Sequence, residues 1–170
     1  MGTKIKRPLI AHFLDTSQAT EYANATWKRI GVNVTDMSID YGVQTETEQD
    51  IVSNSATTDV TGYQPTSAVS QQCTKGDEIF EFITTLRRNR AILGECQTWM
   101  LNVDLWDSSG TTTVTYVAEV QQVSIQVDTY GGAGGETPVQ EFTINFVGDP
   151  VKGTVTVDAT TGVPTFTAAT

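Results

Sequence analysis

The sequence predicts a mainly β protein, a β-sandwich with one flanking α-helix at about residues 77–90. Three observations predict this class. Most apolar residues alternate with polar ones at the period of a strand, and one segment alone has the longer period of an amphipathic helix. The chain also contains 29 threonines, whose branched Cβ suits a pleated surface. A length of 170 residues fits a single domain, residues 1–170.

Residues 1–26 have no long hydrophobic period, and we expect an N-terminal arm region. Residues 8–14 would form an extended arm or an edge strand, because Pro8 cannot donate a hydrogen bond to a sheet. The polar residues 16–24 would form a loop or a short helix. Residues 27–34 and 37–43 then alternate in opposite phases, which indicates a turn or a bulge between them.

Residues 45–61 are polar and acidic, and we expect a long loop there. Loops of this length in compact domains are usually functional or disordered. The segment is too long and too polar to serve a monomer, so we interpret it as an inter-subunit loop. Its charged residues are Glu46, Glu48, Asp50 and Asp59.

Residues 76–90 contain the predicted helix. Acidic residues occupy its first turn and arginines its last, where each sign opposes the partial charge of the helix end. Thr84 and Thr85 fall on the side expected to be exposed. The core face has the spacing i, i+3, i+4 and i+7, and consists of Ile79, Phe82, Ile83 and Leu86.

The remaining chain alternates as strands do, with a bulge expected at Gln121 and Gln122. Residues 130–139 would be the flexible glycine-rich tip of a hairpin. Residues 158–170 would be a C-terminal tail with Phe166 as its only large anchor. The expected strands and turns are strand 99–107, turn 107–110, long strand 114–128, strand 142–146, turn 148–150 and strand 153–157.

The sequence does not favour an enzyme, a metal site or a cofactor site. His12 is the only histidine, and Cys73 and Cys96 are not in a metal-binding spacing, so we expect two buried or half-buried thiols. The glycines of 131–135 do not form a dinucleotide fingerprint. A net charge of −10 with ten Lys plus Arg argues against tight nucleic-acid binding. No apolar run is long enough to span a membrane, and we expect a soluble intracellular protein.

Four short motifs, TGYQPT at 61–66, GDEIF at 76–80, FVGD at 146–149 and GTV at 153–155, resemble the major tail tube protein of long, non-contractile-tailed bacteriophages. The resemblance implies a β-sandwich with one flanking helix. Six subunits would form a ring, and stacked rings would form a tube that delivers DNA. It also implies tape-measure and other tail proteins as partners, assembly in the host cytoplasm, and a place in the virion tail.

Within that arrangement, the sheet face opposite the core would line the channel, because strand side chains alternate. The inner sheet would contain strands 37–46, 66–74, 114–128 and 139–147. The channel-facing residues would be Asp40, Gln72, Gln122, Ser124, Gln126, Asp128, Glu141 and Asn145. These residues could instead be the solvated face of ordinary antiparallel strands. The alternative function is a monomeric β-sandwich module that binds a carbohydrate or a receptor.

Overall fold

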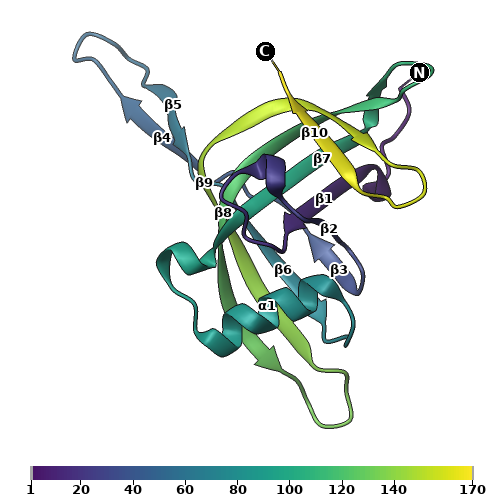
Figure 1. Ribbon diagram of the computed structural model, residues 1–170. Coiled ribbons are helices and arrows are strands. Elements are labelled where there is room, and N and C mark those ends of the chain that lie inside the picture. Colours follow the sequence, from purple (N-terminus) through teal and green to yellow (C-terminus); the bar gives the residue numbers. More distant parts are fainter. Residues whose placement is uncertain (1, 170) are drawn as a thin grey trace.

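The computed structural model describes residues 2–169, which form one eight-stranded sheet, one two-stranded sheet and one α-helix, α1 (Glu78–Asn89) (Figure 1). This confirms the prediction of a mainly β fold with a single helix. The strands are β1 (Ile10–Asp15), β2 (Trp27–Ile30), β3 (Val34–Met37), β4 (Val43–Glu48), β5 (Thr57–Tyr63), β6 (Thr66–Gln72), β7 (Gln97–Ser109), β8 (Thr115–Gly131), β9 (Val139–Val157) and β10 (Pro164–Ala168). Three 3₁₀ turns are η1 (Arg7–Leu9), η2 (Tyr22–Asn24) and η3 (Leu93–Cys96).

The large sheet is antiparallel and curls strongly along its strand order, β2-β1-β7-β8-β9-β6-β3, with β10 on the end of β9. β2 and β3 stand at opposite ends of this order, yet only residues 31–33 separate them in the chain. The two ends of the sheet must therefore approach each other. Val32 lies in this turn and is exposed, so the alternation predicted to run through residues 27–34 is interrupted at residues 31–33.

β8 and β9 form the long hairpin expected around the glycine-rich segment, and they run through the whole molecule. Gln122 pairs with Val147 but Val120 pairs with Val151, so residues 148–150 bulge opposite Gln121. The register shifts at the predicted position, but the extra residues lie in β9, where a turn was predicted at 148–150, and not in β8. A side-chain hydrogen bond from Gln121 to the Gly148 carbonyl holds the bulge. This explains how one 19-residue strand replaces two predicted ones.

The curled sheet encloses two separate hydrophobic cores. The first lies between the sheet and α1 and includes Leu14 and Met100. The second lies on the other face of the sheet and includes Phe13 and Leu101. Neighbouring residues of β1 and β7 thus serve different cores, because successive side chains of a strand point to opposite faces.

β1 is an interior strand between β2 and β7, so the predicted N-terminal arm is wrong for this segment. The strand is buried on both faces, which gives it apolar residues in both phases. The loop that follows folds back over the second core. Buried Asp15 holds it by accepting hydrogen bonds from the backbone N–H groups of Ser17, Ala19 and Thr26, at 2.9, 2.8 and 2.8 Å.

The predicted C-terminal tail also packs on its own domain. β10 pairs with β9 along five residues. The rings of Phe166 and Tyr22 pack in a T-shaped arrangement with their centroids 5.7 Å apart, and Tyr22 packs in the same way on Trp99 at a centroid distance of 5.6 Å. Residues from both ends of the chain therefore close the second core.

Candidate assembly surfaces

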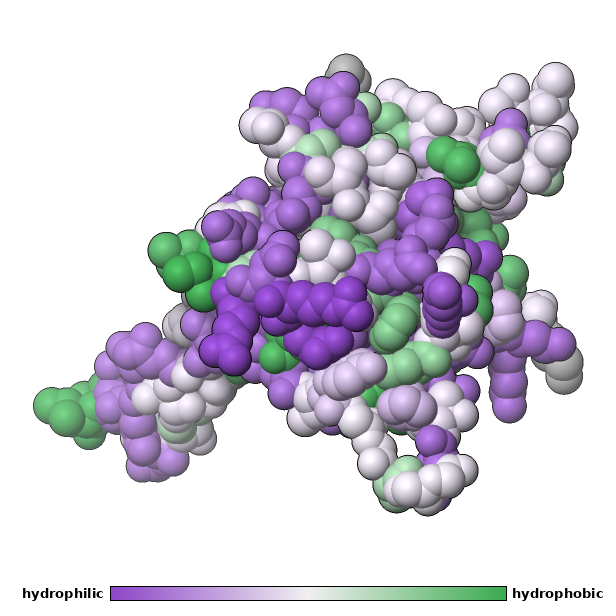
Figure 2. Space-filling view, turned by 60° about the horizontal axis from the view of Figure 1, so that its bottom comes forward, coloured by the Kyte–Doolittle hydropathy of each residue, from purple (hydrophilic) through white to green (hydrophobic). Residues whose placement is uncertain are grey.

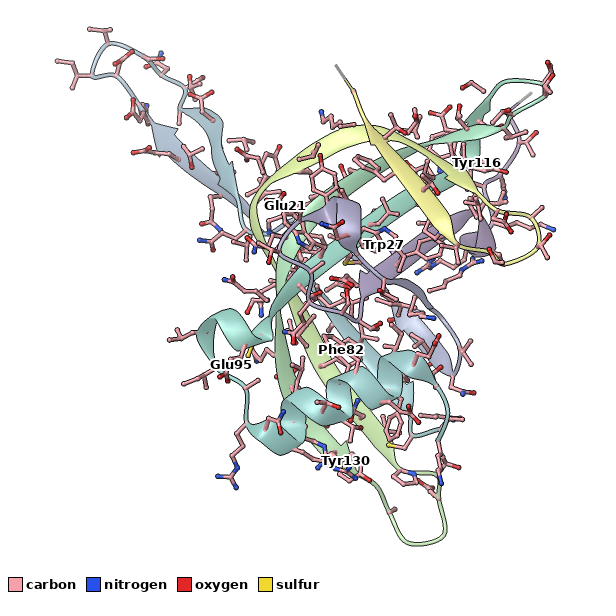
Figure 3. All side chains as sticks on the ribbon, viewed as in Figure 1. Glu21, Trp27, Phe82, Glu95, Tyr116 and Tyr130 are labelled. Atoms are coloured by element: carbon pink, nitrogen blue, oxygen red, sulfur yellow. The ribbon has the colours of Figure 1, made fainter. Side chains whose placement is uncertain are left out.

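α1 is fixed at both ends by side chains from the sheet and the adjoining loop. Asp77 caps the first turn by accepting from the Phe80 N–H at 2.8 Å, and buried Gln71 donates to the same carboxylate at 2.9 Å. At the other end, the Arg87 guanidinium lies 3.9 Å from the ring centroid of Tyr130. Figure 3 shows Tyr130 below the helix, near the glycine-rich hairpin.

The helix presents Ile79, Ile83 and Leu86 to the first core as fully buried side chains, and Phe82 as a half-buried one. The expectation that Thr84 lies on the exposed side is wrong. Its side chain is buried and donates a hydrogen bond to the Gln140 amide oxygen at 3.3 Å. Gln140 itself is fully buried in β9. It lies on the same strand face as the apolar Phe142 and Ile144, although its own side chain is polar.

The structure places the eight predicted channel residues on one face of the β8-β9-β6 sheet, away from α1. Opposite residues of an antiparallel pair share a face, and Asn145 pairs with both Thr66 and Ser124. Asp40, which lies outside a continuous strand, joins this face through an isolated bridge to Thr66. The strand predicted at 37–46 is therefore interrupted there. We call this surface the polar sheet face: Asp40, Gln72, Gln122, Ser124, Gln126, Asp128, Glu141 and Asn145.

The carboxylates of the polar sheet face are held by neutral donors. Asp128 accepts from the Gln126 amide at 2.6 Å and from the Thr143 hydroxyl at 2.7 Å. Glu141 accepts from the Thr129 hydroxyl at 2.7 Å. Because amide and hydroxyl donors carry no net charge, the face keeps its negative charge.

The segment predicted as a long loop is instead a β-hairpin, β4–β5, which projects from the domain (Figure 1). We call residues 43–63 the arm. Gly42 sets its base, since its backbone has φ +52° and a Cβ there would collide with the Gln64 carbonyl oxygen. The Gln64 N–H also donates to the Tyr41 carbonyl at 3.1 Å. The arm therefore leaves the domain in a fixed direction.

The two faces of the arm differ in chemistry. One face carries the pair Glu46 and Asp59, which lie directly opposite each other, and Glu48 beside them. Like charges in directly opposite positions destabilise a strand pair. The other face carries β-branched and aromatic residues: Val43, Thr45, Thr47, Thr58, Val60 and Tyr63.

Every residue from 43 to 61 is exposed. Ile51 and Val52 form the tip and are 105% and 90% exposed, as much as in an extended chain. Figure 2 shows the arm at the left with its hydrophobic end pointing into solvent. A two-stranded hairpin is marginally stable alone in water. Its composition and position therefore suit a segment that binds another surface.

The histidine and the two cysteines considered as candidate catalytic or metal-binding residues lie within the folded domain. His12 is buried, and its Nδ1 lies 2.7 Å from the Asn102 amide oxygen; burial lowers its pKa. Cys73 and Cys96 are free, half-buried thiols, as expected, and burial raises the pKa of each. Within residues 2–169, no three His, Cys, Asp or Glu side chains are grouped to hold a metal ion. No helix in that range has the length and apolar character to cross a membrane.

Two tail structures are among the solved structures with a similar fold. The chain is similar to the SPP1 tail tube, with a TM-score of 0.63 and 13% identity, over 88% of this chain and 78% of that one. It is also similar to the tail of an empty GTA particle refined with C6 helical symmetry, with a TM-score of 0.55 and 10% identity, over 86% and 97% of the two chains. No family model and no curated protein matches the sequence. The chain thus has the fold of a tail tube protein.

Proposed function

We propose that this chain is the major tail tube subunit of a phage with a long, non-contractile tail. Its copies assemble into hexameric rings, and the rings stack into the tube that delivers DNA. The observation that carries the proposal is the arm, an exposed hairpin with a fixed base on a domain that has the fold of the SPP1 tail tube. The C6 symmetry of the GTA tail supports six copies per ring.

The polar sheet face then lines the bore of the tube. DNA is a polyanion with condensed counterions, and lysine or arginine side chains would release those ions and bind it. The residues of this face offer amides, hydroxyls and carboxylates instead. DNA would therefore pass without tight binding. The other partners would be the tape-measure protein and further tail proteins, in a virion tail assembled in the host cytoplasm.

A monomeric module that binds a carbohydrate or a receptor is the less favoured alternative. Such a module leaves the acidic arm and its apolar tip without a role, although both are fully exposed. Light scattering separates the two functions, because the proposed subunit forms rings or tubes. A protein that stays monomeric at high concentration and in phage particles would end the proposal.

Removal of the arm provides the sharper test. A variant with Glu46–Asp59 replaced by a two-glycine turn should stay folded, with an unchanged thermal midpoint, since these residues pack on no core. It should form no tubes in negative-stain micrographs. The matched control shortens the glycine-rich tip at residues 132–136, which is equally exposed. Normal tubes from the variant without the arm would show that the arm is not an interface.

A further inference from the structure

A hollow lies where the two ends of the curled sheet approach without pairing. It has a volume of about 530 Å³ and lies between β2, β3 and η1. Within residues 2–169, β2 pairs only with β1 and β3 only with β6, so both strands have a free edge here. We call it the seam hollow. Its apolar lining is Pro8, Ile10, Ile30, Val32, Val34 and Met37.

Two arginines border the seam hollow, and both are bonded only to backbone carbonyls. Arg7 donates to the carbonyls of Ile10 and Met37 at 2.8 and 3.1 Å. Arg29 donates to the Pro8 carbonyl at 3.3 Å. In the described part of the chain neither guanidinium forms a salt bridge, although the Asp36 carboxylate also lies on the lining. The hollow is therefore apolar inside and carries net positive charge at its rim.

The arm has the complementary character. Its tip has two exposed aliphatic side chains, and residues 43–63 contain four carboxylates and no lysine or arginine. In Figure 1 the arm projects at the upper left while β2 and β3 lie at the right. The arm therefore cannot reach the seam hollow of its own chain.

We propose that the seam hollow receives the tip of the arm of a second copy of this chain. Ile51 and Val52 enter the apolar lining, and the carboxylates of Glu48 and Asp50 face the guanidinium groups of Arg7 and Arg29. This inference rests on the proposed self-assembly, and it identifies the surface of the neighbouring copy to which the arm binds. A knob and a hollow on opposite sides of one molecule make a head-to-tail contact, which repeats into a closed ring or an open filament.

Another hollow is larger but does not suit the arm. It lies beside α1, has a volume of about 850 Å³, and is lined by Glu78, Glu81 and Glu95 among others. Three carboxylates would repel an acidic arm. The arginines at the end of α1 are another basic surface, and Arg88 there is exposed and serves as the control position.

Disulfide cross-linking tests the contact. The variant Ile51→Cys/Val32→Cys is made in a Cys73→Ser/Cys96→Ser background, whose fold is checked by circular dichroism. A disulfide needs Cα atoms about 4.4–6.8 Å apart, so it forms only if the tip reaches the hollow. Mild oxidation of assembled tubes should give a ladder of covalent multimers on a non-reducing gel. A head-to-tail contact links every copy to two neighbours, so the ladder extends beyond dimers.

The control, Ile51→Cys/Arg88→Cys in the same background, should give no ladder. Tubes that form without a ladder from the Val32 variant, or that give an equal ladder from the control, overturn the docking site and leave self-assembly standing. A protein that forms no multimers at all, by light scattering, defeats the proposed function together with this inference.

A charge exchange gives a second, independent readout. Arg29→Glu should reduce the fraction of protein that sediments as tubes, with a larger loss at low salt, where the repulsion is less screened. Asp50→Arg in the same chain should restore that fraction. Failure of the second substitution to restore it would overturn the placement of Arg29 against the arm.

Discussion

His12 is a basic side chain held in a buried place between β2 and β7. Its Nδ1 lies 2.7 Å from Asn102, and burial, the main cause, lowers its pKa below the usual 6.5. The neighbouring charges of Arg7 and Arg29 lower the pKa further, while Asn102 and Asp104 oppose the shift. His12 is therefore neutral in the folded protein near pH 7.

The pKa of His12 makes stability depend on pH. The unfolded chain takes up a proton as the pH falls below about 6.5, whereas the folded chain does so only at lower pH, so stability is full above 6.5 and declines below it. The slope is at most about 1.4 kcal/mol per pH unit. Urea titrations at pH 7.5, 6.5 and 5.5 should show this decline, and His12→Gln should lack its share of it. Parallel declines in the two proteins would contradict the assignment.

Single buried polar residues were the hardest to predict from the sequence. Asp15 ends an apolar segment and precedes a polar loop, so its neighbours indicate exposure, yet it is completely buried beneath that loop. Gln71 and Gln140 are polar side chains that are likewise buried, beneath α1. Gln71 donates to Asp77, six residues later, across the turn into α1, and Gln140 accepts from Thr84, 56 residues earlier in the chain. Neither bond is visible in the alternation of the strand to which the glutamine belongs.

At the scale of elements, α1 was predictable because its signals are local. The core-face periodicity and the charges of the first and last turns all fall within residues 77–90. The arm was not predictable as a hairpin, because both of its faces are exposed and the alternation that marks a half-buried strand is weak. The burial of β1 depends on two strands that come later in the chain, so its own sequence does not distinguish it from an arm or an edge strand.

Substitutions in α1 test the helix and its packing. Ile83→Ala should lower the free energy of unfolding by roughly 2–5 kcal/mol, because the side chain is fully buried. Thr84→Ala should cost about 1–2 kcal/mol through its lost bond to Gln140. Thr85→Ala, on the exposed side, should change stability by less than about 0.5 kcal/mol. Urea denaturation measures all three, and equal losses at Thr84 and Thr85 would contradict the helical phase.

At the scale of the whole molecule, the polar sheet face joins residues from β6, β8 and β9 and the bridge at Asp40. The alternation of each strand placed its own residues correctly on one side. These residues form one surface only because β6 pairs with β9 and β9 pairs with β8. No local signal in the sequence shows the pairing of β6 with β9. The curl of the sheet likewise follows from the short β2–β3 link only once the strand order is known.

Charge reversal on the polar sheet face tests its place in the bore. Particles with Asp128→Lys or Glu141→Lys should contain normal tubes but eject DNA more slowly, and the delay should grow at low salt because phosphates would bind the added lysines. Glu136→Lys, at the exposed glycine-rich tip, is the control and should eject normally. Ejection rates measured against ionic strength decide the matter: normal rates at low salt in particles that carry the reversed residues would place this face outside the bore.

The composition of the arm has a consequence for proteolysis. Trypsin cleaves after lysine and arginine, and the chain has neither between Arg29 and Lys75. The most exposed part of the subunit therefore offers trypsin no cleavage site, whether or not a neighbouring copy covers it. A protease specific for glutamate meets Glu46 and Glu48 on the open hairpin, so resistance to that enzyme distinguishes a covered arm from a free one.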